Sequence, residues 1–310
     1  PALPSIMAAI AENGGRFVET GVPRTCRAGT VRFVYAAYAE LRNSLNELLG
    51  YSIMERDLTD SVRLEQRLKE SYEQLKETQS ATIKGWAQLT EYRDKETGRH
   101  LTRISDYTRV LASHLRKNPR YTGYITDGYI EDLCLSAILH DVGKVAIDNS
   151  ILLKPDKLTP AEYARMKEHA RLGGDALTAV ERHLKRQSFL TLGKEIAYHH
   201  HEWWNGSGYP DGRKGEEIPL SARIVAVADV YDALTSERPY KKAFPHEEAV
   251  RMIEAERGTH FDPEIVDVFL ENAETFNRIK LFNEFEDNPE NISDLLDRPS
   301  RRGVEHEREA

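Results

Sequence analysis

The sequence predicts a mainly α-helical protein with a small antiparallel β segment at its N-terminus. Two observations favour helices over most of the chain. Apolar residues recur at helical spacing from Asp127 onward, and Pro219 precedes a long run that is apolar almost all round. A third observation sets the first 60 residues apart, because three runs rich in β-branched and aromatic residues follow one another there.

The composition is that of a globular protein: of 310 residues, 40% are hydrophobic and 30% are charged. The net charge of −8 argues against a broad nucleic-acid surface, so we expect no DNA partner. The two cysteines form no Cys-x-x-Cys pattern, and no apolar run approaches the roughly 18–20 residues that span a bilayer. We therefore expect a cytoplasmic protein. The start at Pro1, without an initiator methionine, is typical of a piece of a longer chain.

The first 60 residues predict an antiparallel meander. Its candidate strands are residues 16–20, 30–38 and 48–54, and the last leads into Asp57-Leu58-Thr59-Asp60. This pattern resembles the C-terminal half of a PAS sensor domain, in which the last strand runs through an Asp-x-Thr turn into a helix. The resemblance implies a sensor input, without the half of the domain that supplies most of a ligand pocket.

Residues 61–92 predict a helical connector. Leucines and mostly polar residues alternate along one heptad seam: Leu64, Leu68, Leu75 and Leu89, with Ser71, Thr78, Thr82 and Gly85. A seam this polar suits an amphipathic helix lying on its own domain, or a parallel dimeric connector. We favour the second interpretation, which predicts a homodimer whose connector passes a shift from sensor to effector.

Ligand-type side chains begin at the start of the larger helical domain, which we place at residues 93–282. Glu96 and His100 are four residues apart on one expected helix, a spacing that suits a metal ion but also a solvated ion pair. His140 and Asp141 end the helix that begins at Asp127, and they are followed by Gly143 and Lys144.

Histidines recur further along the domain. His169 lies on a helix with Thr159 as N-cap and Pro160 at its first position, which we expect to end at Gly173-Gly174. A lone histidine on a helix is more often structural than a ligand. The run His199-His200-His201 stands in the middle of another expected helix and has no packing rationale.

A glycine-rich loop with aromatic residues follows at 203–212. It could be an ordinary surface turn, but exposed tryptophans would be unusual there. Asp229 and Asp232 then interrupt the apolar helix, and a buried carboxylate must be paired or bound to metal. Arg238 and Lys241 form a basic patch after that helix. Phe261-Asp262-Pro263 opens the last expected helix, and the polar tail, residues 283–310, is expected to be disordered.

Residues from about 80 to 282 resemble the HD-GYP branch of the HD phosphohydrolase superfamily. The resemblance rests on an ordered set of motifs: Glu96-Thr97-Gly98-x-His100-x-x-Arg103, His140-Asp141-x-Gly143-Lys144, His169, His200-His201-Glu202, Gly208-Tyr209-Pro210, Asp229-x-x-Asp232-Ala233, Arg238-Pro239-Tyr240-Lys241 and Phe261-Asp262-Pro263. It implies a helical bundle around a metal cluster and the hydrolysis of cyclic di-GMP.

The resemblance also implies roles for individual residues. The metal ligands would be Glu96, His100, His140, Asp141, His169, His200, His201 and Asp229. The catalytic residues would be Asp141 and Lys144, and the substrate contacts Gly208, Tyr209, Pro210, Asp232, Arg238 and Lys241. Members with the glutamate resemble a three-metal subtype, so two or three divalent ions are implied, with iron or manganese as the metal.

These roles imply a mechanism. Asp141 would bridge two cations that share a hydroxide, and the hydroxide would attack one phosphodiester in line while the metals neutralise charge. Arg238 and Lys241 would hold the substrate phosphates, and the loop around Tyr209 would face a guanine and offer a surface to protein partners. The product would be linear pGpG or, after a second cleavage, GMP.

Two alternatives stand beside this hypothesis. The domain could be a catalytically weak receptor for cyclic di-GMP that signals through a partner, although the complete ligand set favours an enzyme. It could also hydrolyse another cyclic dinucleotide. Asn205 stands where the family usually has aspartate and bears on substrate preference.

Overall fold

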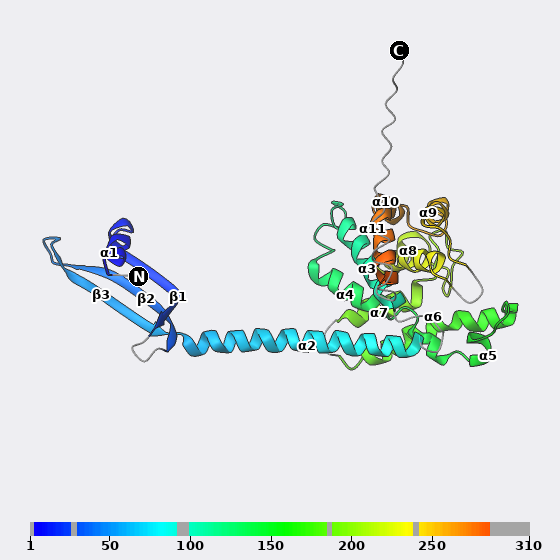
Figure 1. Ribbon diagram of the computed structural model, residues 1–310, viewed down its shortest axis with the longest axis horizontal. Coiled ribbons are helices and arrows are strands. Elements are labelled where there is room, and N and C mark those ends of the chain that lie inside the picture. The colour runs from blue at the N-terminus through cyan, green and yellow to red at the C-terminus, as the bar shows by residue number, and fades with distance from the viewer. Residues whose placement is uncertain (1–2, 26–29, 92–98, 185–187, 238–241, 286–310) are drawn as a thin grey trace, which may run out of the picture. The chain divides into compact units, whose positions relative to one another are not determined.

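The computed structural model describes residues 3–25, 30–91, 99–184, 188–237 and 242–285 (Figure 1). Helices predominate among these residues, and the strands form one three-stranded antiparallel sheet. The predicted mainly α fold with a small β segment is confirmed. Among the described helices, none combines the length and apolar character that crossing a membrane requires. The contacts divide the chain into two compact units, residues 1–79 and 80–310.

The first unit is a sheet with one short helix packed on it. Its elements are α1 (Leu3–Glu12), β1 (Arg16–Thr25), β2 (Val31–Arg42) and β3 (Leu48–Asp57), with the strands in the order β1-β2-β3. Burial alternates along β2, as a period of two requires, so Ala36 and Tyr38 share a face and pack with Ile6 and Ile10 of α1. The resemblance of this segment to a PAS domain stays a prediction.

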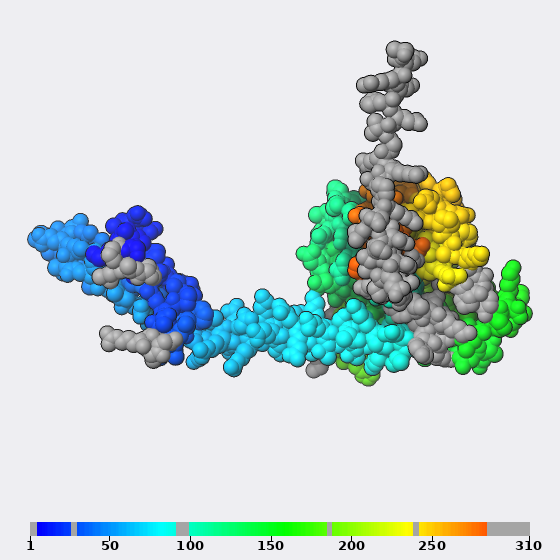
Figure 2. Space-filling model, in the orientation of Figure 1, coloured from blue at the N-terminus to red at the C-terminus, as the bar shows by residue number. Residues whose placement is uncertain are grey.

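Helix α2 (Thr59–Glu91) begins in the first unit and ends in the second. Asp57 Oδ1 accepts the Thr59 backbone N–H at 2.9 Å, and Thr59 Oγ1 accepts that of Phe33 at 3.0 Å, which fixes the helix start on the sheet. The predicted seam leucines are between 67% and 70% exposed: Leu64, Leu68, Leu75 and Leu89. Figure 2 shows side chains along α2 uncovered on the face in view. Leu64, Leu68 and Leu75 therefore do not pack on the described part of the first unit, and Leu89 does not pack on that of the second.

The second unit is a helical bundle around α8 (Leu220–Thr235). The elements around it are α3 (Arg99–Leu115), α4 (Asp127–Ala137), η1 (Val142–Ala146), α5 (Asn149–Leu152), α6 (Pro160–Glu181), α7 (Phe189–His199), η2 (Gly215–Glu217), α9 (His246–Ala255), α10 (Pro263–Glu271) and α11 (Ala273–Phe285). Helix α8 is buried along most of its length, as its apolar sequence predicts, and packs against α3, α7, α9 and α10. The ring of Tyr231 on α8 contacts those of Tyr107, Phe269 and Phe276 with centroids 5.2–5.5 Å apart, and Phe276 contacts Tyr107 and Phe269 at 4.5 and 5.0 Å.

Two predicted helix starts are confirmed in detail. The Thr159 hydroxyl accepts the backbone N–H of Glu162, whose carboxylate accepts that of Thr159, so the start of α6 is a capping box with Pro160 in the first turn. At the start of α10, Asp262 accepts the backbone N–H of Glu264 at 2.9 Å. At both helix starts, side chains within the first turn accept the backbone N–H groups that the helix leaves unpaired.

Several predicted helix ends are wrong. Helix α6 continues through Gly173-Gly174 to Glu181, and α7 ends at His199, so His200 and His201 follow the helix and do not lie in its middle. Helix α4 ends at Ala137, three residues before His140. A further helix, α11, follows the one expected to be last, and Phe276 and Ile279 attach it to the core.

The glycines that look like helix breakers permit close packing instead. A Cβ on Gly143 would lie 2.0 Å from the carbonyl oxygen of His169 and 2.5 Å from the backbone nitrogen of Gly173. A Cβ on Gly174 would lie 2.4 Å from the ring of Tyr198. Hydrogen at these positions therefore lets η1 and α7 approach the backbone of α6.

Gly143→Ala is expected to lower the free energy of unfolding by about 3 kcal/mol or more, because the new methyl group meets rigid backbone and not a movable side chain. Gly128→Ala is the matched control: its Cβ would meet only Thr126 Oγ1, at 3.8 Å, so stability should change by less than about 1 kcal/mol. Urea unfolding followed by circular dichroism measures both. Equal midpoints for the two variants would contradict this account of the packing.

Candidate metal centre

The fold of the second unit brings seven of the predicted metal ligands together in two adjoining groups. One group contains Asp141, His169, His200 and His201, and the other contains His100, His140 and Asp229. Within each group, one ligand atom of every residue lies within 4.8 Å of the others. The ligands come from α3, the turn after α4, α6, the end of α7 and α8, so the centre forms only when the bundle folds.

Asp141 connects the two groups. Its Oδ1 lies 3.2 Å from His169 Nε2 and 3.7 Å from His200 Nε2. Its Oδ2 lies 3.3 Å from Nε2 of His140, which is itself 3.8 Å from Asp229 Oδ1. One carboxylate therefore presents an oxygen to each group, which is the arrangement a bridging ligand requires.

Backbone carbonyls orient three of the imidazoles. The Nδ1 atoms of His140, His169 and His200 lie 2.9, 2.7 and 2.9 Å from the carbonyl oxygens of Ala137, Met166 and Ile196, so each Nδ1 carries the hydrogen. Their Nε2 atoms are buried without a hydrogen-bond partner among the described residues. Buried lone pairs without donors are costly unless something binds them, and this pattern fits metal ligation through Nε2.

The charges of three ligands, His200, His201 and Asp141, agree with that fit. Burial lowers the pKa of His201 to about 3 and that of His200 well below its usual value, so both imidazoles are neutral. Burial opposes ionisation of Asp141, but Lys144 and His140 hold its pKa well below the ordinary value. For His140, the carboxylates of Asp141 and Asp229 outweigh burial and raise the pKa to about 10. Neutral imidazoles and an ionised carboxylate suit divalent transition ions, whereas His140 would be protonated in the metal-free protein and would lose that proton to a bound ion.

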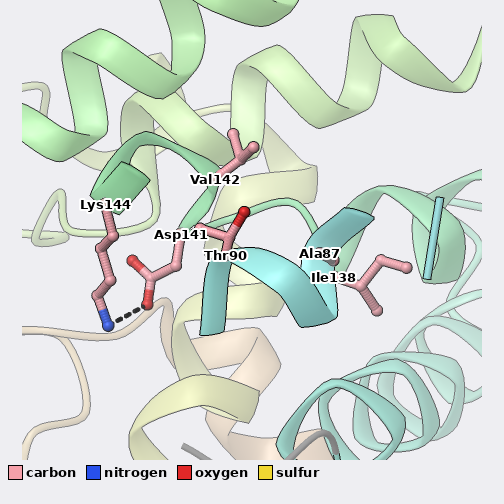
Figure 3. A pocket seen from close by; sticks show the side chains of 6 residues that line it. All are labelled: Ala87, Thr90, Ile138, Asp141, Val142 and Lys144. Atoms are coloured by element: carbon pink, nitrogen blue, oxygen red, sulfur yellow. Dashed lines mark ion pairs between the residues drawn. The ribbon is translucent and has the colours of Figure 1, made fainter. Parts of the chain in front are cut away.

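Lys144 and the end of α2 border the centre. Lys144 Nζ lies 2.8 Å from Asp141 Oδ2, and both residues line a small pocket with Ala87 and Thr90 of α2 (Figure 3). Ala87 is 3% exposed and packs in a hydrophobic cluster with Ile138 and others near the turn. The last turns of α2 are therefore part of the wall beside the central carboxylate.

Asp232 forms a buried network with a ligand. Its Oδ2 lies 2.7 Å from His100 Nδ1, and its two oxygens accept from Arg103 Nε and Nη2 at 2.5 and 2.8 Å. Burial raises the pKa of Asp232, but Arg103 and His100 outweigh it and lower the pKa to about 2. Asp232 is 1% exposed and hydrogen-bonded to His100, so it positions this ligand. The sequence, by contrast, predicts a substrate contact for Asp232. Arg103 is part of the motif that begins at Glu96, but the sequence does not indicate that it pairs with Asp232.

The Gly208-Tyr209-Pro210 loop packs on the centre. The Tyr209 ring lies 4.7 Å from the His201 ring, and Lys167 Nζ lies 4.9 Å from the centre of the Tyr209 ring. A Cβ on Gly208 would lie 2.3 Å from the backbone nitrogen of Trp203, so the loop is folded tightly on itself. Tyr209 therefore supports a ligand. The sequence does not predict the contact between Lys167 and Tyr209, because a single lysine on a helix with many charged residues is common.

The neighbouring aromatic residues anchor the loop. The ring of Trp203 stacks on that of His260 with centroids 4.3 Å apart, and the Arg223 guanidinium lies 5.7 Å from the Trp204 ring. Backbone hydrogen bonds from Trp204 and Asn205 to residues 260 and 259 tie the loop to the turn before α10. The two tryptophans are thus accounted for by packing.

Three predicted site residues, Glu96, Arg238 and Lys241, lie outside the described residues. A third group of potential ligands does lie within them. It consists of His199, the first of the three consecutive histidines, with Glu202 and Asp211.

A family model described as an HD domain matches residues 87–265, more than half of the chain. Three proteins illustrate what the chain is similar to. A "Cyclic di-GMP phosphodiesterase" of Vibrio cholerae is 47% identical over 233 residues, which cover 75% of this chain and 46% of that protein. The "Cyclic di-GMP phosphodiesterase response regulator RpfG" of Xanthomonas campestris is 40% identical, covering 77% and 60%. A "3'3'-cGAMP-specific phosphodiesterase 2" of Vibrio cholerae is 39% identical, covering 66% and 37%. The chain spans about half the length of the relatives it matches.

Asp232→Asn is expected to lower metal affinity at the His100–His140–Asp229 group by roughly 10- to 100-fold, because the imidazole of His100 loses its charged partner. The affinity of the Asp141–His169–His200–His201 group should change little. Competition of a chelating dye for Mn²⁺ resolves the two classes. Ser236→Ala is the control: it removes a hydroxyl that accepts from Arg103 at 3.0 Å and donates to Asp232 Oδ2 at 3.4 Å, but it keeps the charged Asp232–His100 pair and should bind as the wild type does. An unaltered titration of Asp232→Asn would show that the network does not position His100.

Proposed function

The chain belongs to the HD domain family, and on that basis we propose that it is a metal-dependent phosphodiesterase that hydrolyses cyclic di-GMP. The observation that carries the proposal is the position of Asp141, with one oxygen toward each of two ligand groups. The names of the relatives support the substrate class.

In this proposal the ligands are the seven described residues together with Glu96. Divalent ions bound there supply an acidified water as nucleophile and positive charge for the phosphate oxygens. Two ions correspond to the two observed groups, and Glu96 beside His100 would allow a third. Iron or manganese is the proposed metal, since imidazole and carboxylate oxygen suit both.

The remaining residues of the site hold and orient the substrate. Lys144 lies on Asp141 and adds positive charge where the phosphate would bind. Arg238 can contact a phosphate through two N–H groups, and Lys241 adds a second cation. The loop at Gly208, which is half-buried, and Pro210, which is exposed, would contact a guanine or a protein partner, while Tyr209 keeps His201 in place. The proposed product is pGpG, with GMP after a second cleavage.

A cyclic dinucleotide other than cyclic di-GMP is the second candidate substrate. One observation favours it: a relative with 39% identity is named as specific for 3'3'-cGAMP. A catalytically weak receptor is the third interpretation, and the closely gathered ligand atoms argue against it.

We propose that the N-terminal segment regulates the site through α2. The last turns of α2 pack on the turn that carries Asp141 and Lys144, with Ala87 and Thr90 lining the same pocket (Figure 3). A rotation or shift of α2 would therefore move groups in contact with the central carboxylate. This route gives a PAS-like sensor a physical means of changing turnover in the cytoplasm.

We also propose that a second copy of the chain covers the exposed leucine seam of α2. The seam follows the 4–3 spacing of a parallel coiled coil, and its leucines are exposed in the single chain. The serine, threonine and glycine between them would keep such a dimer only moderately stable, which suits a connector with two states of similar energy.

The first test is turnover. Protein purified anaerobically, with its metals quantified, is expected to convert cyclic di-GMP to pGpG in a chromatographic assay, faster than it converts cyclic GMP-AMP. Metal-replete protein that leaves cyclic di-GMP intact would end the proposal. Preferential turnover of cyclic GMP-AMP would favour the second candidate.

Two variants separate metal binding from substrate binding. Asp141→Ala should abolish turnover together with metal occupancy, because both groups lose their shared ligand. Arg238→Ala should retain the metals but raise KM by roughly tenfold or more, since a phosphate contact is lost. Arg257→Ala, which removes an exposed arginine paired with Asp267, is the control and should leave KM unchanged. Equal KM values for the two arginine variants would remove Arg238 from the substrate site.

The double substitution Leu68→Ala, Leu75→Ala is expected to shift the chain from dimer to monomer in light scattering after size exclusion, because it removes two seam side chains. Lys69→Ala, Lys76→Ala changes the adjacent positions outside the seam and should leave the mass unchanged. If both double variants have the mass of the wild type, the seam is not the dimer contact.

A further inference from the structure

We propose that His199, Glu202 and Asp211 form an additional site for a divalent ion such as Zn²⁺, separate from the centre at Asp141. His199 is the last residue of α7, Glu202 follows it three residues later, and Asp211 directly follows Pro210. One ligand atom of each lies within 4.8 Å of the other two. The chain thus places an imidazole and two carboxylates together on the other side of the loop.

The imidazole of His199 is the observation that points to a ligand. Its side chain is 7% exposed, and its Nδ1 atom is buried without a hydrogen-bond partner among the described residues. That atom lies 4.0 Å from Glu202 Oε1 and 3.9 Å from Asp211 Oδ2, too far for a hydrogen bond to either. A buried nitrogen facing two carboxylate oxygens across a gap of this size is what an ion would satisfy.

Glu202 is already oriented for ligation. Its Oε1 accepts the backbone N–H of Asp211 at 2.8 Å, and its Oε2 accepts that of Arg213 at 3.1 Å. The backbone N–H of Gly212 is a further donor to this carboxylate, so three of its four acceptor positions are used and one is left for an ion. The side chain is fully buried and is held in place by these bonds. The same hydrogen bonds fix the backbone that carries Asp211.

The spacing allows coordination with small movements. Four ligands at about 2.1 Å from Zn²⁺ in a tetrahedron lie about 3.4 Å apart, so His199 and the carboxylates need to approach by about half an ångström. The Asp211 side chain is 54% exposed and free to move that distance. The adjoining pocket, lined in part by Tyr198, His199 and Pro210, leaves room for water to complete the coordination.

Arg213 is the competing cation. Its Nε lies 3.5 Å from Asp211 Oδ2, so the guanidinium can neutralise Asp211 without any metal. Arg213 has no hydrogen bond to His199 Nδ1, however, and leaves that buried atom unsatisfied. The two explanations differ in one measurable respect: if an ion competes with Arg213, removing the guanidinium should strengthen metal binding.

An ion at this site would join two parts of the candidate centre. His199 directly precedes His200 and His201, and Asp211 directly follows the Gly208-Tyr209-Pro210 loop. Coordination would hold the loop against the end of α7. This inference does not depend on the substrate, because it concerns metal binding alone.

The test is the Zn²⁺ stoichiometry of the full chain, measured by mass spectrometry of the metal after saturation and gel filtration. Wild-type protein is expected to hold one more equivalent per chain than His199→Ala or Asp211→Asn. Asp267→Asn is the matched control, because Asp267 is 53% exposed and pairs with an arginine as Asp211 does, and it should retain the full number. Arg213→Gln should bind the additional ion more tightly than the wild type in a calorimetric titration.

Equal stoichiometry in wild type, His199→Ala and Asp211→Asn would overturn the proposal, and so would an Arg213→Gln variant without tighter binding. Asp211→Asn alters an exposed side chain, so it keeps the test valid if His199→Ala does not fold. Hydrolysis of cyclic di-GMP is not the readout. A failure of the proposed activity therefore leaves this result interpretable, and a missing additional ion leaves the proposed activity standing.

Discussion

The close contact between Gly143 and the backbone of α6 is the constraint on which the candidate centre depends. Asp141 lies two residues before this contact, and His169 supplies the carbonyl that the glycine approaches. Any side chain at residue 143 would push the turn away from α6 and separate Asp141 Oδ1 from His169 Nε2, now 3.2 Å apart. The packing of two backbones thus sets the distance between two ligands.

Charge compensation explains how so many polar groups remain buried in this bundle. Lys144 and His140 stabilise the carboxylate of Asp141, and Arg103 stabilises that of Asp232. Each acid keeps its negative charge because a cation is fixed beside it by the fold. Bound divalent ions would take over part of this role at Asp141, which would leave Lys144 able to interact with a phosphate.

Local sequence predicted the parts of the fold that local chemistry determines. Thr159 and Glu162 carry both halves of a capping box, so the start of α6 could be read directly. The end of α6 could not, because whether Gly173 breaks a helix or admits a neighbour depends on Gly143, 30 residues away. The ligand set was likewise visible in motifs, whereas the pairing of Asp232 with His100 and Arg103 joins α8 to α3 and has no signal in either helix alone.

The three consecutive histidines show why position along a helix end matters for function. Helix α7 ends at His199 and the next two histidines lie in the turn after it, so the three side chains are not confined to one helix face. His200 and His201 reach the centre with Asp141, while Nδ1 of His199 faces Glu202 and Asp211. The end of α7 therefore serves two clusters at once. Tyr209 packs on His201 and Asp211 faces His199, so one loop contributes a side chain beside each cluster.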